Sequence, residues 1–168
     1  MIKRPALLLL SALLVTSVHA RDLGRTDYQA ALEEAKQENK MVLLSFIASD
    51  CDYKSMQFNK EVISKPGFIQ YARKNLIVVE VDFPMKKKQD VALQQQNLNL
   101  LKQYGADTPI PMVILLNAKG EEIARQTERI ANEVAPLIKW IDAAKKQAEQ
   151  PQSPPQPPAQ PATPSPQT

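Results

Sequence analysis

Two mostly apolar runs of strand length most constrain the fold of this chain. They are Met41–Ile47 and Leu76–Asp82. Runs of this kind, without polar alternation, are typical of parallel strands covered on both faces, and parallel neighbours require a crossover connection between them. The intervening segment supplies one, because its pattern predicts helices at 52–64 and 68–74 around the breaker Lys65-Pro66-Gly67.

The remaining periodicity predicts three more helices and a hairpin. Thr26-Asp27-Tyr28-Gln29 has the form of a capping box that opens a helix, and a later helix spans about 89–104. Strands at 112–116 and 121–125 flank a turn at 117–120, and a last helix carries Pro136 in its first turn. The residues expected to face the core from these helices are Tyr28, Ala31, Leu32 and Ala35, then Leu93, Leu98, Leu101 and Tyr104, then Val134, Leu137, Ile138 and Ile141.

The resulting order, α-β-α-α-β-α-β-β-α, predicts an α/β sandwich. A mixed sheet with two parallel strands and an antiparallel hairpin would be flanked by helices. Residues 21–150 would form this one domain. The run Lys86-Lys87-Lys88 falls between predicted elements and is interpreted as a solvated loop.

The first 20 residues have the pattern of a cleaved signal peptide. Lys3 and Arg4 precede an apolar run at 6–15, and Val18-His19-Ala20 supplies small residues at cleavage spacing. The apolar run is too short for a spanning helix. We therefore expect cleavage after Ala20, a periplasmic or secreted protein and no membrane span in the mature chain; an uncleaved anchor is the alternative.

The last 18 residues, 151–168, contain eight prolines and no large apolar side chain. Such a segment cannot bury enough surface to offset its ordering entropy, so we expect a disordered, extended Pro/Gln-rich tail. It would serve as a spacer, as a ligand for a proline-reading groove, or simply as a solvated end.

Charge and ligand content exclude several function classes. Removal of residues 1–20 leaves 21 − 2 = 19 basic and 18 acidic residues, a nearly neutral chain with no sign of nucleic-acid binding. His19 is the only histidine and Cys51 the only cysteine. A zinc or copper site needs several nitrogen or sulfur ligands, so we expect neither a metal nor another cofactor.

Cys51 lies where the first predicted strand runs into a helix, in the sequence S-D-C-D-Y-K-S-M. An unpaired cysteine in an oxidising compartment is buried, paired to another chain, or reactive. Its neighbours Ser49, Asp50 and Asp52 are the residue types that cap helices. A catalytic role for these carboxylates is disfavoured because no partner base or phosphate-binding loop accompanies them.

Several stretches resemble thioredoxin-like domains of the secreted disulfide-reductase type, over about residues 27–148. The resemblance implies a thioredoxin-like fold with thiol–disulfide interchange ancestry. It also implies that Ile110-Pro111 matches the family's cis-proline loop, beside which an extended substrate strand pairs with the backbone, and that the extra Pro109 reshapes this loop. The matching stretches are Val42–Ala48 with Ser49-Asp50, Glu61–Ile63, Val79–Pro84, Tyr104-Gly105, Ile110–Val113 and Asn117–Gly120.

The chain departs from this family at the C-x-x-C motif. Alignment through Glu61-Val62 places Asp52 at the attacking cysteine and Ser55 at the resolving cysteine. Counting from Phe46 instead places Cys51 and Lys54 at these positions. Neither register supplies a second thiol, which dithiol exchange requires.

Two functions follow from this departure. The first is a protein- or peptide-binding or scaffolding module that uses Cys51–Ser55, including Tyr53 and Lys54, together with Ile110 and Pro111. The second is a monothiol exchange protein in which Cys51 forms a mixed disulfide that an external thiol resolves. In that case the helix start and Lys54 would favour the thiolate.

Overall fold

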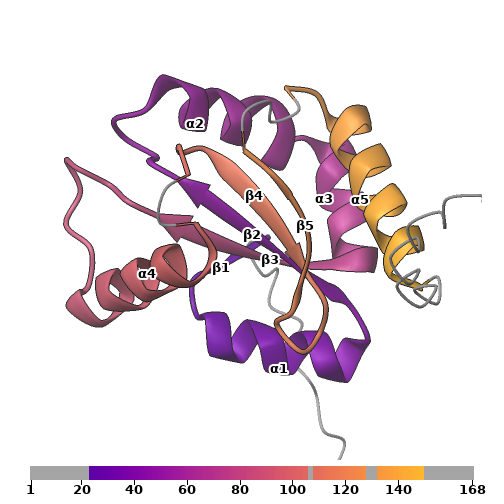
Figure 1. The fold of residues 1–168 in the computed structure, drawn as a ribbon. Coiled ribbons are helices and arrows are strands. Elements are labelled where there is room, and N and C mark those ends of the chain that lie inside the picture. Colours follow the sequence, from indigo (N-terminus) through magenta and orange to yellow (C-terminus); the bar gives the residue numbers. More distant parts are fainter. Residues whose placement is uncertain (1–22, 106–107, 128–131, 150–168) are drawn as a thin grey trace, which may run out of the picture.

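A five-stranded mixed sheet forms the centre of the molecule. The computed structural model describes residues 23–105, 108–127 and 132–149; the expected signal peptide and proline-rich tail lie outside these ranges. The strands are β1 (Gly24–Arg25), β2 (Met41–Ile47), β3 (Leu76–Asp82), β4 (Met112–Leu116) and β5 (Glu122–Gln126). Their order is β1-β3-β2-β4-β5 (Figure 1), with β1 and β2 parallel to β3, β4 antiparallel to β2, and β5 antiparallel to β4.

The two central strands follow the predicted ranges residue for residue. β2 pairs with β3 from Met41–Leu76 to Ile47–Asp82, and all of β2 after Met41 is buried. Phe46 of β2 lies opposite Met112, the first residue of β4. The segments after Ile47, after Asp82 and before Met112 therefore emerge at the same end of the sheet.

Helices cover both faces of the sheet, which confirms the predicted α/β sandwich (Figure 1). α1 and α4 pack on one face, where Tyr28 and Leu100 are buried. The other helices pack on the second face, where Phe58 and Leu137 are buried. The helical elements are α1 (Tyr28–Glu38), α2 (Tyr53–Phe58), the π-helical turn η1 (Asn59–Ile63), α3 (Pro66–Asn75), α4 (Val91–Tyr104) and α5 (Val134–Glu149).

One helix cap, one helix and one strand differ from the prediction. Asp27, not Thr26, caps α1, because its carboxylate accepts the Ala30 N–H at 3.0 Å. The predicted helix 52–64 is divided into α2 and η1. The two-residue strand β1 has no apolar pattern of its own and is defined by its pairing with β3.

The inward face of α4 also differs from the prediction. Leu98, expected to point inward, is 39% exposed, whereas Asn97 and Leu100 are buried. The Asn97 amide donates to the Asp82 carbonyl at 3.0 Å. A polar side chain with such a partner can occupy a core position, so apolar spacing placed Leu98 wrongly, whereas Tyr104 is buried and Leu101 packs against the core as predicted.

Candidate functional site

Asp52 and Ser55 form a closed hydrogen-bonded pair at the start of α2. Asp52 is the N-cap, and its Oδ2 accepts from the Ser55 backbone N–H at 2.7 Å and from the Ser55 hydroxyl at 2.8 Å. The Ser55 Oγ in turn accepts the Ala48 N–H at 3.1 Å. Ser55 is completely buried. The pair therefore connects the end of β2 to the first turn of α2 and offers no accessible nucleophile.

Ser49 and Asp50 do not cap the helix, contrary to the capping interpretation. Ser49 donates its N–H and its hydroxyl to the Asp82 carboxylate at 2.8 and 2.6 Å. Asp50 accepts three successive backbone N–H groups, from Met85, Lys86 and Lys87, at 2.8 to 2.9 Å. These bonds, that of Met85 first, lower the pKa of the Asp50 carboxyl. The two residues thus anchor the Cys51 loop to the end of β3 and to the segment that follows it.

Cys51 is exposed in the turn that precedes the N-cap. The surrounding loop removes part of the water around its sulfur, and the Asp50 carboxylate adds a negative charge and a hydrogen bond. These effects, in that order, raise the pKa of the Cys51 thiol above its ordinary value. The raised pKa of Cys51 runs against the expectation that the helix start and Lys54 favour the thiolate.

The predicted partner-binding residues differ widely in exposure. Tyr53 is 72% exposed and Lys54 is exposed. Ile110 is partly exposed, whereas Pro111 is buried behind a cis Ile110-Pro111 bond. This bond directly precedes β4, at the same end of the sheet as the Cys51 loop. Tyr53, Lys54 and Ile110 therefore have surface available for a partner, and Pro111 acts on the backbone of the turn.

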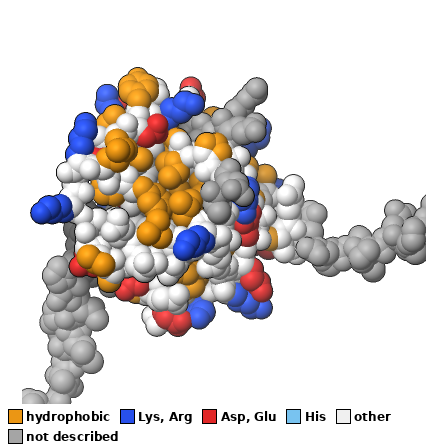
Figure 2. Space-filling model, turned by 60° about the vertical axis from the view of Figure 1, so that its left-hand side comes forward, with side chains coloured by type: hydrophobic (Ala, Val, Ile, Leu, Met, Phe, Trp, Pro, Cys, Tyr) orange, Lys and Arg blue, Asp and Glu red, His pale blue; other side chains and the backbone are white. Residues whose placement is uncertain are grey.

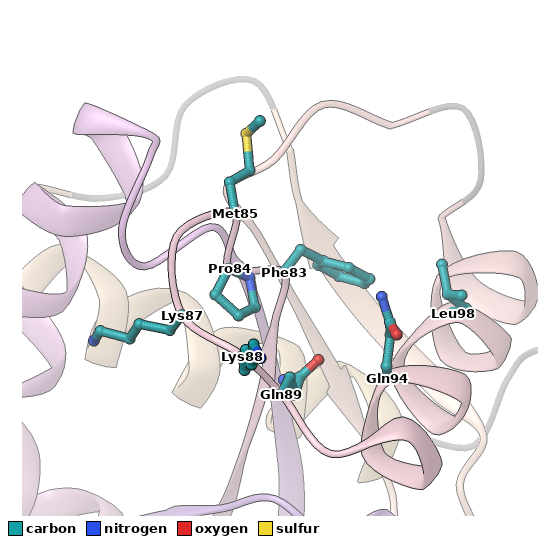
Figure 3. Close-up of a pocket in the computed structure, with 8 residues that line it drawn as sticks. All are labelled: Phe83, Pro84, Met85, Lys87, Lys88, Gln89, Gln94 and Leu98. Atoms are coloured by element: carbon teal, nitrogen blue, oxygen red, sulfur yellow. The ribbon is translucent and has the colours of Figure 1, made fainter.

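A groove beside the Cys51 loop was missed in the sequence. It lies between the β3–α4 connection and α4 and has a volume of about 500 Å³ (Figure 3). It was missed because Phe83-Pro84 looked only like the end of a strand and Leu98 of the other wall was expected to face the core. The residues that line it are Phe83, Pro84, Met85, Lys87, Lys88, Gln89, Gln94 and Leu98.

Apolar surface is concentrated around this end of the molecule. All the large apolar side chains that are exposed among the described residues belong to α2, to α4 or to the connection before α4. Figure 2 shows apolar side chains gathered on one face of the molecule, with basic side chains around them. A contiguous apolar patch on a monomer commonly marks an interaction site. The exposed large apolar side chains are Tyr53, Met56, Met85, Val91 and Leu98.

Residues 23–105, 108–127 and 132–149 contain neither a membrane span nor a metal centre. No helix in these ranges is long and apolar enough to cross a membrane. No group of three or more His, Cys, Asp or Glu side chains there is arranged to hold a metal ion.

Comparison with known proteins identifies the family to which this chain is related. The thioredoxin-like domain matches residues 28–138. The disulfide bond reductase DsbH of Chlamydia pneumoniae is 32% identical over 108 residues, which cover 64% of each protein. The thioredoxin-related protein DsbJ of the same organism is 33% identical over 99 residues, which cover 59% of this chain and 28% of DsbJ. The alignments thus span less than two thirds of either relative.

Solved structures agree with these matches. A DsbH oxidoreductase superposes with a TM-score of 0.65 and 30% identity, covering 71% of this chain and 82% of that one. The C-terminal domain of Neisseria meningitidis DsbD in its reduced form superposes with a TM-score of 0.50 at 21% identity, covering 69% and 92%, and shows the fold alone. Cys51 is the only cysteine here, so the C-x-x-C pair is missing. The chain belongs to the thioredoxin-like domain family.

Proposed function

We propose that this chain is an exported thioredoxin-fold protein that binds a protein or an extended peptide and has no dithiol chemistry. Its binding face comprises Cys51, Tyr53 and Lys54 with Ile110 of the cis-proline turn. The observation that carries the proposal is the Asp52–Ser55 pair, which occupies the start of α2 with hydrogen bonds. The apparent signal peptide at 1–20 supports export to the periplasm or the exterior.

The geometry at α2 argues against reductase activity of the kind that the name DsbH describes. In a dithiol enzyme, a thiolate attacks the substrate disulfide and a second thiol resolves the mixed disulfide. Here Asp52 and Ser55 are three residues apart at the helix start and contact each other, which supports the register that places them at the cysteine positions. A carboxylate does not attack sulfur, and the buried Ser55 hydroxyl cannot reach a mixed disulfide.

The same end of the sheet retains what binding requires. Tyr53 presents a large aromatic surface, and aromatic side chains are frequent anchors at interfaces. The turn at Ile110 leads into β4, and the backbone of this turn can pair with an extended segment in a β-addition mode. Because Pro111 is buried, it shapes this turn and does not contact the partner directly.

The exposure of Cys51 favours a second candidate, monothiol exchange. The Cys51 thiolate would attack one sulfur of a partner disulfide, and the other sulfur would leave as a thiolate. An external thiol would then attack the mixed disulfide and release Cys51. The raised pKa of Cys51 opposes this function, because less of the thiol is ionised near neutral pH.

Two measurements on residues 21–168 separate these functions. The first is binding of a reduced, carboxymethylated unfolded protein, followed by fluorescence anisotropy. We expect Cys51→Ser to bind as tightly as the parent chain and Tyr53→Ala to bind more weakly, with the exposed Lys119→Ala as the control. The second is mass spectrometry after incubation with oxidised glutathione, in which we expect slow adduct formation.

Absence of binding to the unfolded protein in the parent chain would refute the binding module. Rapid glutathione adduct formation, reversed by added thiol and lost in Cys51→Ser, would establish monothiol exchange instead. Turnover of insulin disulfides that requires both Cys51 and an external thiol would likewise support monothiol exchange, whereas turnover that persists in Cys51→Ser would contradict both candidates.

A further inference from the structure

The groove between the β3–α4 connection and α4 combines an apolar floor with a basic rim. The Phe83 ring points toward Gln94 and Leu98 of α4, while Met85 and Lys87 project from the connection on other sides (Figure 3). None of the eight residues that line the groove is acidic, and two, Lys87 and Lys88, are lysines. The groove can therefore accept an apolar side chain and favours negative charge beside it.

The lysines on this rim are available to a partner. Lys86, Lys87 and Lys88 are all exposed, and none has a carboxylate within salt-bridge distance among the described residues. Lys87 acts on Glu80 only through longer-range attraction, which lowers the pKa of Glu80 against the larger effect of burial. Uncompensated positive charge beside an apolar groove is complementary to an acidic partner.

The acidic residues Asp50 and Asp90 near the groove form no salt bridge with these lysines. The Asp50 carboxylate accepts the N–H groups of Met85, Lys86 and Lys87. The Asp90 carboxylate accepts the N–H groups of Ala92 and Leu93 at the start of α4. Both carboxylates thus hydrogen-bond to the backbone of the groove wall, and neither forms a salt bridge with a lysine side chain of the rim.

We propose that this groove binds a segment of the partner protein in which an apolar side chain is flanked by carboxylates. The proposal rests on the binding function and adds the chemistry of the partner. Asp50, the residue next to Cys51, accepts the Met85 N–H of the groove wall, so the groove lies beside the Cys51 loop. A partner held in the groove would extend past Cys51.

Charge distinguishes this occupant from the chain's own C-terminal segment. Residues 151–168 contain no acidic residue, so they cannot pair with the lysines of the rim. A second copy of the chain is a competing occupant. It would bury Leu98 in a dimer and make binding depend on protein concentration.

The test uses fluorescein-labelled nine-residue peptides that differ only in flanking charge. Each has a central Leu-Phe pair flanked by Glu, by Gln or by Lys, and its affinity for residues 21–168 is measured by fluorescence anisotropy. We expect the Glu peptide to bind about fivefold more tightly than the Gln peptide, since several exposed charge pairs of modest strength contribute. The preference should shrink at high salt, because exposed charges are screened.

Matched variants assign the preference to the groove. Lys87→Glu/Lys88→Glu should abolish the preference for Glu, whereas Lys119→Glu/Lys146→Glu changes the net charge equally on exposed residues outside the groove and should preserve it. Leu98→Gln should weaken the binding of all three peptides. Val91→Gln should not, because Val91 is exposed on the same helix but does not line the groove. Circular dichroism verifies that each variant is folded.

Three results would overturn the proposal: equal affinity for the Glu and Gln peptides, persistence of the preference in Lys87→Glu/Lys88→Glu, or its loss in the control pair. A dimer in sedimentation that Leu98→Gln dissociates would assign the groove to a second copy. If the carboxymethylated unfolded protein still binds in a Tyr53-dependent way while the charged peptides do not discriminate, the binding function stands and only the groove assignment fails.

Discussion

The loop–helix junction at residues 48–55 has an inward side that is closed by hydrogen bonds and an outward side that is exposed to solvent. On the inward side, Asp52 and Ser55 satisfy each other and the Ala48 N–H, and Ser55 has no solvent contact. On the outward side, Cys51 is exposed and Tyr53 presents most of its surface to water. The inward side fixes the fold at this point, and the outward side is available to a partner.

This contrast shows how a redox junction can lose its chemistry without losing its shape. A buried polar pair is tolerated only when each member has a partner, and here the two replacements provide partners for each other. Only the outward side is then free to determine binding. Variants confined to one side can therefore test the contrast.

The strongest test introduces a cysteine pair into each register. The first variant, Cys51→Ser/Asp52→Cys/Ser55→Cys, has its only two cysteines at the inward positions 52 and 55. The second variant, Lys54→Cys, keeps the native Cys51 and adds a cysteine three residues later. We expect an intramolecular disulfide in the first variant only, because the Asp52 and Ser55 side chains meet at 2.8 Å, whereas Lys54 is exposed. Non-reducing mass spectrometry after air oxidation detects the bond. An intramolecular disulfide in the Lys54→Cys variant would contradict the inward assignment.

Removal of the Ser55 hydroxyl should destabilise the domain. Ser55→Ala leaves the Ala48 N–H and one bond of Asp52 without their partner, which costs about 1–3 kcal/mol. Urea unfolding followed by circular dichroism measures the change. Ser64→Ala is the control, because that hydroxyl bonds only to Asn59 at an exposed position, and its effect should be within about 0.5 kcal/mol. Equal effects would show that the inward pair contributes little.

Cys51 should react slowly near pH 7 and faster in Asp50→Asn. The pKa of the Asp50 carboxyl is lowered, so this residue stays charged throughout the titration of the thiol and opposes its ionisation. Removing the charge should lower the pKa of Cys51 and raise its alkylation rate at pH 7 roughly a few-fold. Timed alkylation across pH, with Glu33→Gln on α1 as control, measures this shift. An unchanged alkylation rate would show that the Asp50 charge does not control the reactivity of the Cys51 thiol.

The smallest effect on stability is expected at Tyr53. Because this side chain is 72% exposed, Tyr53→Ala should change the free energy of unfolding by less than about 0.5 kcal/mol. The matched comparison is Phe58→Ala in the same helix, which removes a buried ring and should cost about 3–5 kcal/mol. Urea unfolding compares the two. A large loss of stability at Tyr53 would mean that the outward side also supports the fold.

Much of the fold could be predicted because it depends on local pattern. The apolar runs predicted Met41–Ile47 and Leu76–Asp82 with their observed bounds. The helix predicted at 68–74 exists, but it begins at Pro66, inside the segment that was interpreted as a breaker. What failed depends on distant partners. Leu98 was assigned inward because the bond between Asn97 and Asp82 cannot be seen in apolar spacing.

The candidate site was predictable in part for the same reason. Cys51, Asp52 and Ser55 lie within five residues of the chain, so their junction and its missing cysteines were visible in the sequence. The bonds from Met85, Lys86 and Lys87 to Asp50 join segments 35 to 37 residues apart and carry no local signal. Asp50 therefore looked like one more capping residue, and the groove beside it was not recognised.

The Asp52–Ser55 hydrogen bond has a consequence for how the protein responds to its surroundings. A cysteine pair alternates between two covalent states as the glutathione poise of a compartment changes. A carboxylate–hydroxyl bond has no such alternation, so the start of α2 keeps one geometry in oxidising and reducing media alike. The Asp52–Ser55 pair would therefore hold this part of the proposed binding face in the same shape whatever the ambient redox potential.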